Sequence, residues 1–171
     1  MLVPMKSLSI RNANTEDIES IVKVRRTAFT DEEVRGFTTP GRSIFYSVSR
    51  LKRAWKEDNR LKGEWEIYVA LDKQSIVGFI VFKVEKSAGY IDNINVAKQQ
   101  KGKGVGKALV TRVEEIARSR GIRVMKTDTT ENAEGKPWQS YGFWLKMGYK
   151  DTGERLPTKW DFKEISFFKK L

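Results

Sequence analysis

The 171-residue sequence contains no cysteine and no histidine. Without cysteine, the chain cannot form a disulfide, a thiolate nucleophile or a cysteine-ligated metal site. Without histidine, it cannot build a Ser-His-Asp triad, and it lacks the side chain whose ordinary pKa lies nearest to neutral pH. An enzyme of this composition must therefore use carboxylates, tyrosines, lysines, backbone groups or water, and we expect no metal.

Long apolar segments are also missing. No apolar run approaches the roughly 20 residues that a helix needs to cross a bilayer, and the start of the chain has neither the apolar stretch nor the cleavage site of a signal peptide. Hydrophobic residues make up 39% and charged residues 32% of the chain, which is the balance of a globular protein. We therefore expect a single domain over residues 1–171, located in the cytoplasm and not on a membrane.

Acidic residues are outnumbered, with 33 Lys and Arg against 22 Asp and Glu, which gives a net charge of +11. This excess favours polyanionic partners such as nucleic acids, acidic proteins or a phosphorylated cofactor. A solvated basic surface explains it equally well. Because no helix-turn-helix, zinc-finger or RNP signature is present, a basic nucleic-acid-binding protein is kept only as an alternative.

Hydrophobic periodicity predicts strands and helices in alternation. The expected elements of the first half are a strand at 7–10, a helix capped by Asn14 or Thr15, a loop or broken turn over 31–42, a helix over 43–61, and strands at 65–72, 75–85 and 89–96. Those of the second half are a helix that starts at Val105 and is stopped by Gly121, a strand at 122–130, a helix ending before Gly148, and strands near 149–154 and 159–169. The second and third strands form a hairpin, whereas the long helical crossover implies a parallel pair. The fold class is therefore α/β, with a mixed sheet and helices on both faces.

The most informative segment is KGKGVGKAL, between an expected strand and an expected helix. It holds three alternating glycines and three lysines: Gly102, Gly104, Gly106, Lys101, Lys103 and Lys107. Glycine allows unusual backbone angles and close approach of a ligand, and successive N–H groups at a helix N-terminus bind anions. The segment therefore predicts a phosphate site, with pyrophosphate as the first candidate.

Two familiar phosphate loops do not fit this spacing. A Walker A loop has four residues between its glycines and then Lys followed by Ser or Thr. Here Gly102 and Gly106 enclose three residues, and Ala108 follows Lys107. A dinucleotide-binding loop reads GxGxxG, whereas this one reads GxGxG. A flexible turn without a ligand is the remaining alternative, and the amphipathic helix after the loop argues against it.

The segment INVAKQQKGKGVGKALV resembles motif A of the GNAT superfamily of N-acetyltransferases. The residues that carry the resemblance are Ile91, Ile94 and Val96 in the strand and Lys101, Gly104 and Gly106 in the loop. The family has Arg or Gln at the position of Lys101. Farther on, Asn132 matches an asparagine that often contacts the cofactor, and FWLKMGY resembles the family pattern Phe-Tyr-x-Lys-x-Gly-Phe. The order of elements also agrees, so the resemblance covers nearly the whole chain.

The resemblance implies a mostly antiparallel, splayed sheet of about seven strands, acetyl-CoA as co-substrate and a primary amine as acceptor. The strand at 89–96 would carry a bulge and diverge from the strand at 122–130, so that the pantetheine arm enters between them. A backbone N–H near Val96 would polarise the thioester carbonyl. The implied cofactor-binding residues are Ile94, Asn95, Val96, Lys101, Gly102, Lys103, Gly104, Val105, Gly106, Lys107, Asn132, Trp144 and Lys146.

The strand at 89–96 also contains candidates for the catalytic base. Asp92 is the first candidate for the base, because it lies on the strand beside the cofactor gap and shares a face with Tyr90. Tyr90 occupies the position where some family members have a catalytic glutamate. A solvated carboxylate with no catalytic role is the alternative for Asp92.

The family's usual acidic tyrosine falls at Trp144, and an indole N–H is not a proton-transferring acid near pH 7. Tyr141, one turn earlier on the same helix, can supply a hydroxyl. Alternatively, water protonates the departing thiolate, or the protein binds acetyl-CoA without turnover.

The acceptor depends on the segments that transfer least between relatives, residues 29–45 and the final hairpin near 153–161. Protein N-termini, lysine side chains and small amines all stay open. The chain also has an insertion between Asn132 and Phe143, which we expect to reshape either the adenine end or the acceptor mouth. Dimers are common in the family, and the sequence leaves the oligomeric state open.

Overall fold

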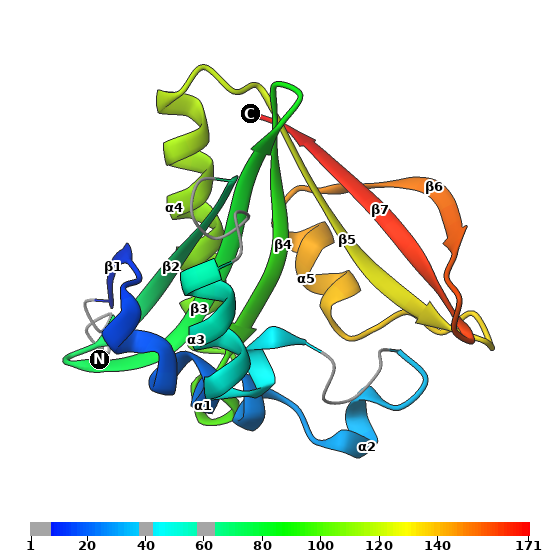
Figure 1. Ribbon diagram of the computed structural model, residues 1–171. Helices are drawn as coiled ribbons and strands as arrows, with labels where there is room; N and C mark the ends of the chain where they lie inside the picture. Colours follow the sequence, from blue (N-terminus) through cyan, green and yellow to red (C-terminus); the bar gives the residue numbers. More distant parts are fainter. Residues whose placement is uncertain (1–7, 38–42, 58–63) are drawn as a thin grey trace, which may run out of the picture.

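A computed structural model describes residues 8–37, 43–57 and 64–171 and contains one seven-stranded sheet (Figure 1). The strand order is β1-β2-β3-β4-β5-β7-β6. The strands are β1 (Leu8–Asn12), β2 (Trp65–Asp72), β3 (Ser75–Glu85), β4 (Ala88–Val96), β5 (Val124–Asn132), β6 (Lys150–Pro157) and β7 (Phe162–Lys170). All neighbouring pairs are antiparallel except β4 and β5, which confirms the mixed, mostly antiparallel sheet.

Helices cover both faces of this sheet. They are α1 (Ile18–Ala28), α2 (Asp31–Val34), α3 (Val48–Glu57), α4 (Val105–Ser119) and α5 (Ser140–Lys146), with 3-10 turns η1 (Thr15–Asp17), η2 (Ile44–Tyr46) and η4 (Lys98–Gln100). In one core, α1 and α3 pack on β2 and β3; in the other, α4 and α5 pack on the opposite face. None of these helices is long and apolar enough to cross a membrane.

Two sequence expectations on the N-terminal half were wrong in detail. The predicted loop over 31–42 contains α2, because Thr30 and Glu33 form a reciprocal capping box that begins a helix. The predicted helix over 43–61 is interrupted at Ser47, whose extended backbone separates η2 from α3. Residues 38–42 and 58–63, which also belong to these expectations, lie outside the described residues.

The β4–β5 pair is the feature that creates a site. Its ladder comprises only Gly89–Ile91 against Met125–Thr127, after which the two strands diverge (Figure 1). On its other side, β4 shifts register against β3, and Asp92 is the extra residue of this bulge. A bulge bends a strand and redirects its side chains. Residues 92–96 of β4 therefore have no ladder partner on β5.

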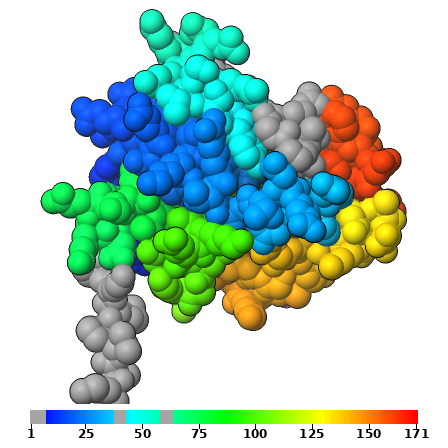
Figure 2. Space-filling view, turned by 90° about the horizontal axis from the view of Figure 1, so that it is seen from below, coloured from blue at the N-terminus to red at the C-terminus, as the bar shows by residue number. Residues whose placement is uncertain are grey.

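Three segments that are distant in the sequence converge at the open end of this gap. Figure 2 shows the α1–α2 segment between the loop before α4 and the loop between β5 and α5. Ring contacts agree with the view, because Phe29 after α1 lies 5.0 Å from the Trp138 ring and 3.6 Å from the Lys101 amine. The fold therefore brings the glycine loop and the inserted segment to the same end of the sheet.

Candidate active site

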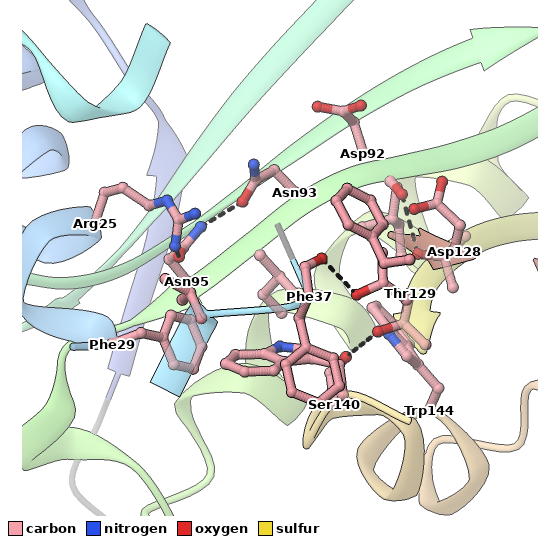
Figure 3. Close-up of a pocket in the computed structure, with 17 residues that line it drawn as sticks. Arg25, Phe29, Phe37, Asp92, Asn93, Asn95, Asp128, Thr129, Ser140 and Trp144 are labelled. Atoms are coloured by element: carbon pink, nitrogen blue, oxygen red, sulfur yellow. Dashed lines mark hydrogen bonds between the residues drawn. The ribbon is translucent and has the colours of Figure 1, made fainter. Parts of the chain in front are cut away.

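The divergence of β4 and β5 encloses a cavity of about 210 Å³, which we call the strand-gap cavity (Figure 3). Residues 91–95 of β4 and 127–130 of β5 form its two sides, and side chains from α1, α5 and the β5–α5 loop complete it. It carries carboxylates at one part of its lining and a guanidinium at another, whereas its remaining walls are largely aromatic and aliphatic.

Two carboxylates, Asp92 and Asp128, line the strand-gap cavity. Asp92 is exposed on the β4 bulge, whereas Asp128 projects from β5 and accepts a hydrogen bond from the Tyr90 hydroxyl. Burial raises the pKa of Asp128 to about 7, the Tyr90 hydrogen bond opposes this rise, and the negative charges of Glu164 and Asp92 add to it. Asp128 can therefore exchange a proton near neutral pH.

Tyr90 serves this carboxylate as a hydrogen-bond donor. Burial and the adjoining Asp128 charge raise the pKa of the phenol far above its ordinary value, so the hydroxyl keeps its proton. Its ring is held edge-on against Trp65, with ring centres 6.5 Å apart. Tyr90 and Asp92 were expected on one face of the strand, and the Asp92 charge does act on the Tyr90 phenol, whereas Asp128 was missed because it belongs to no recognised motif.

Arg25 reaches the cavity from α1 and is 91% buried, with a relative exposure of 9%. Its Nη1 donates to Asn95 Oδ1 at 3.1 Å, and Asn95 donates in turn to the Asn93 side chain (Figure 3). The guanidinium lies 4.6 Å from the centre of the Tyr46 ring. Burial lowers the pKa of Arg25. Sequence reasoning missed this residue, although an arginine in register with the apolar stripe of a helix was a usable signal.

Hydroxyl groups line the β5 side of the cavity. Thr129 and Ser140 share a hydrogen bond of 2.7 Å between their oxygens, and Thr127 donates to the Ile91 carbonyl at 3.0 Å. The latter bond joins β5 to β4 where their ladder ends. Ser140, the first residue of α5, also lines a second cavity, and it therefore lies at the junction of the two.

The inserted segment closes one side of the strand-gap cavity. Its Trp138 packs against Phe29 and Phe37, with ring centres 5.0 and 5.1 Å away. Thr130 of β5 holds the segment after α2 at the same place by donating to the Phe37 carbonyl at 2.9 Å. Because all three rings line the strand-gap cavity, the insertion contributes to this cavity, at its α1–α2 side.

The second cavity, of about 510 Å³, lies against the glycine segment, and we call it the loop cavity. Gly102 and Gly104 have φ values of +75° and +82°, which L side chains rarely adopt. Gly106 allows close packing, since an added Cβ would lie 3.3 Å from the Phe143 ring. Positive backbone angles at the start of a helix turn N–H groups toward an anion, so the loop cavity suits a phosphate group.

The lysines of the glycine segment are not equivalent. Lys107 lines the loop cavity, and Lys103 lines a neighbouring cavity on the flank of α4. Lys101 also borders the loop cavity, but its amine donates to the Ala28 carbonyl and lies over the Phe29 ring. Its charge therefore meets the C-terminal end of α1, where cations are favoured.

Most of the remaining predicted cofactor residues also line these cavities. Ile94, Val96 and Lys146 border the loop cavity, and Trp144 borders the strand-gap cavity. The Trp144 ring is only 2% exposed and packs edge-on against Tyr149. Trp144 therefore belongs to the core and forms a wall of the strand-gap cavity.

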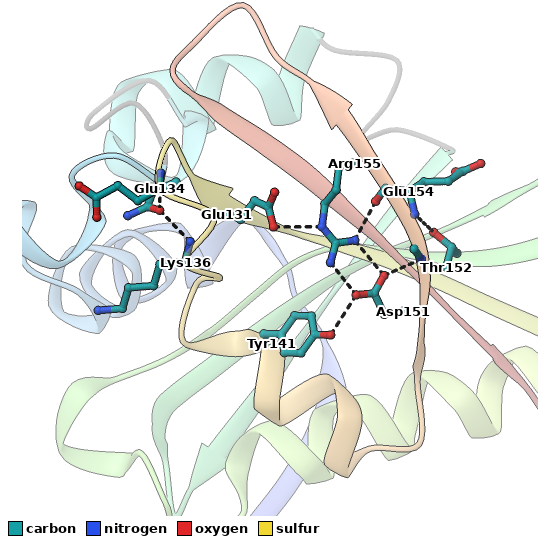
Figure 4. A network of polar contacts seen from close by, with 10 residues as sticks. Glu131, Glu134, Lys136, Tyr141, Asp151, Thr152, Glu154 and Arg155 are labelled. Atoms are coloured by element: carbon teal, nitrogen blue, oxygen red, sulfur yellow. Dashed lines mark hydrogen bonds and ion pairs between the residues drawn. The ribbon is translucent and has the colours of Figure 1, made fainter.

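Two predicted residues lie elsewhere in the structure (Figure 4). The Tyr141 hydroxyl donates to Asp151 at 2.9 Å, and this interaction raises the pKa of the phenol. Asn132 accepts hydrogen bonds from the backbone of Glu134 and Lys136, and so shapes the β5–α5 loop. Neither Tyr141 nor Asn132 lines either cavity, and their predicted roles stay predictions.

A family model described as the acetyltransferase (GNAT) family matches residues 27–149. The chain belongs to the GNAT family. The match includes most residues of the strand-gap cavity, the glycine segment and the FWLKMGY segment, and it confirms the resemblance and the acyltransferase class predicted from these two segments. No curated protein matches this GNAT chain in sequence.

Solved structures share the GNAT fold of this chain. A GCN5-related N-acetyltransferase from Rhodopseudomonas palustris superposes with a TM-score of 0.73, 20% identity and 99% coverage of both chains. The PaiA N-acetyltransferase from Thermoplasma acidophilum, in complex with coenzyme A, gives 0.66 and 20%, covering 96% of this chain and 99% of its own. A ribosomal-protein-alanine N-acetyltransferase from Brucella melitensis gives 0.69 and 18%, with 95% and 99% covered. At these identities the likeness concerns the fold, which is confirmed.

Proposed function

We propose that this GNAT protein transfers an acetyl group from acetyl-CoA to a primary amine within a ternary complex. The observation that carries the proposal is the pair of adjoining cavities, which share Phe29, Ile94 and Ser140 in their linings. One of them has an anion-binding loop, and the other has a carboxylate that titrates near pH 7. Holding both substrates across this junction raises their effective concentration.

The loop cavity is the proposed site of the cofactor's pyrophosphate, with backbone donors from Gly102 to Gly106 and the charge of Lys107. The pantetheine arm then follows the edge of β4 past Ile94 and Val96, where the ladder to β5 has ended. The N–H groups of this edge are the proposed donors to the thioester carbonyl oxygen. The coenzyme A complex of PaiA, which has the same fold, supports this assignment.

The amine nitrogen attacks the thioester carbonyl carbon, its proton passes to a carboxylate, and the C–S bond breaks to release coenzyme A. We propose Asp128 as the base, because its pKa of about 7 suits proton transfer at neutral pH and its carboxylate lines the cavity. Asp92, the candidate from the sequence, stays the second choice, since it lines the same cavity but is exposed. Tyr90 positions Asp128 through its hydrogen bond.

The departing thiolate needs a proton or a hydrogen bond. Ser140 is the proposed donor in place of Tyr141, because its hydroxyl lies at the junction of the cavities, whereas the Tyr141 hydroxyl is engaged by Asp151. A serine hydroxyl is too weak an acid to be the final proton source near pH 7, so that proton comes from water. Trp144 forms the apolar wall beside this point.

Steady-state acetylation of a panel of amines, read by mass spectrometry, tests the proposal. Asp128→Asn should lower kcat by about 10²- to 10⁴-fold, which is the usual worth of a general base, and should remove the acidic limb of the pH profile. Asp92→Asn is the matched variant on the opposite strand. A loss confined to Asp92→Asn would transfer the role of base to Asp92. Binding of acetyl-CoA without acetylation of any amine would contradict the enzyme and leave a sensor.

A further inference from the structure

The strand-gap cavity has a cationic part as well as an acidic part. Arg25 lines it from α1, whereas Asp128 lines it from β5 (Figure 3). On β4, Asp92 borders the acidic part and Asn95 accepts the hydrogen bond from Arg25, and these two residues are about 10 Å apart along the strand at about 3.3 Å per residue. A ligand in this cavity therefore meets opposite charges at two separated points.

Among the described residues, the Arg25 charge has no carboxylate partner. No described residue forms an ion pair with Arg25, and its hydrogen bond within the described ranges goes to the neutral side chain of Asn95. The Nε atom is fully buried and has no hydrogen-bond partner in the described part of the chain. An uncompensated buried cation is costly, and an anion bound beside it offsets this cost.

The neighbouring groups hold Arg25 in place for such a ligand. Tyr46 packs on its guanidinium at 4.6 Å, and Phe29 lies on it at 5.9 Å. The side chains of Asn95 and Asn93 continue from it along β4 as a chain of hydrogen bonds. A guanidinium that is fixed in this way is suited to a planar carboxylate.

We propose that the acceptor is a small primary amine that also carries a carboxylate, with the amine at Asp128 and the carboxylate at Arg25. This inference rests on the proposed acetyl transfer and specifies its substrate. The cavity volume of about 210 Å³ corresponds to roughly seven water molecules at about 30 Å³ each, which suits a compact acceptor. Because Asp128 and Arg25 reach the cavity from different elements, the amine and the carboxylate of the acceptor would be joined by a chain that spans it.

Matched acceptors test this assignment. Straight-chain ω-amino acids of increasing length are compared with unsubstituted amines of the same length, and α-amino acids with their carboxamides. Because a hydrogen bond to a charged group is worth more than a neutral one, the wild type should prefer the carboxylate member by about 10- to 100-fold in kcat/KM. An equal kcat/KM for both members would overturn the proposal while leaving amine acetylation intact.

Three variants connect the preference to Arg25. Arg25→Gln should reduce the preference to within about 3-fold, and Arg25→Lys should give an intermediate value because it keeps the charge but loses the planar fork. Lys23→Gln is the control, since it removes one positive charge from an exposed position of the same helix. If Arg25→Gln retains the full preference, the anion site is elsewhere. Should this variant not fold, Arg25→Lys and the wild-type pairs still decide.

Binding measurements separate this proposal from the proposed function. If no amine is acetylated, amino carboxylates are titrated by calorimetry into the protein saturated with coenzyme A. About 10-fold weaker binding to Arg25→Gln than to Lys23→Gln supports the carboxylate site even without turnover, and equal binding overturns it. A peptide with an acidic N-terminal residue represents a protein acceptor in the same assay. A higher kcat/KM for it than for every free amino carboxylate would overturn the assignment to a small acceptor.

Discussion

At the scale of single residues, the proposed role of Asp128 as a base conflicts with the stability of the fold. Its pKa in the folded protein is about 7, well above the value of about 3.9 for an unperturbed aspartate. Between these two values the folded state binds more protons than the unfolded state, so the free energy of unfolding decreases as pH rises. Above pH 7 the half-buried carboxylate is charged, and the fold carries the cost of that charge.

Asp128→Asn should therefore stabilise the protein at pH 8 while it removes activity. The amide has the size of the carboxylate, accepts the Tyr90 hydrogen bond and carries no charge, so the melting temperature should exceed that of the wild type by several degrees. At pH 4 the two proteins should melt together. Asp161→Asn, an exposed change, should alter stability by no more than about 0.5 kcal/mol at either pH. Equal melting temperatures of Asp128→Asn and wild type at pH 8 would show that the charged carboxylate does not destabilise the fold.

The residues that sequence reasoning found and missed differ in the kind of signal they leave. Gly102 and Gly104 could be singled out because positive φ values before a helix select glycine. Asp128 and Arg25 were missed because their roles depend on burial and on partners contributed by other elements, Tyr90 and Asn95. Tyr141 was proposed as an acid from its helical spacing, and no spacing reveals that its hydroxyl meets Asp151.

At the scale of elements, the packing of α4 against the sheet depends on Gly78 of β3. A Cβ added there would lie 2.9 Å from Val105 Cγ1, 3.0 Å from the Asn95 carbonyl oxygen and 3.2 Å from Leu109 Cδ1. These contacts involve the first turns of α4, which follow the glycine segment directly. The absence of a side chain at Gly78 thus sets how closely the anion-binding end of α4 approaches β3 and β4.

Gly78→Ala should destabilise the protein by about 1–3 kcal/mol, because extra volume in a packed core forces neighbours to shift. Gly142→Ala is the matched control, since a Cβ there has nothing within 4 Å and the position lies inside α5. Alanine suits a helix interior better than glycine, so this change should be neutral or stabilising by up to about 1 kcal/mol. Urea unfolding measures both. A Gly78→Ala variant as stable as wild type would show that α4 can move without cost.

The elements themselves were largely predictable, because each has a local cause. The helix over Val105–Ser119 follows from its apolar stripe and ends at Gly121, whose φ is +76°. The hairpin of β2 and β3 was read correctly from two strand-like runs separated by Lys73 and Gln74. The divergence of β4 from β5 has no local cause in the sequence, and only the family resemblance predicted it.

At the scale of the whole molecule, the site is an assembly of segments that no window of sequence contains. The two cores lie on opposite faces of the sheet, and the sheet opens at β4 and β5 between them (Figure 1). The α1–α2 segment and the β5–α5 loop then meet across the open end through Phe29, Phe37 and Trp138. Loops of this kind vary in length and contact each other only in the folded state, so the acceptor could not be predicted from them.

Acetyl-CoA should stabilise the whole domain, since it would bridge the strands that diverge. At 100 times its dissociation constant, a ligand that binds only the folded state adds about 2.7 kcal/mol, which for a chain of this size raises the melting temperature by roughly 5–10 °C. If the phosphate groups bind in the loop cavity beside Lys107, as proposed, the shift should shrink between 0.05 M and 0.5 M salt. Acetyl-pantetheine, which lacks the pyrophosphate, should give a smaller shift with little dependence on salt. If salt reduces the acetyl-CoA-induced shift equally in Lys107→Gln and wild type, the pyrophosphate does not lie at this lysine. If acetyl-CoA leaves the melting temperature unchanged, the cofactor site is not formed by these cavities.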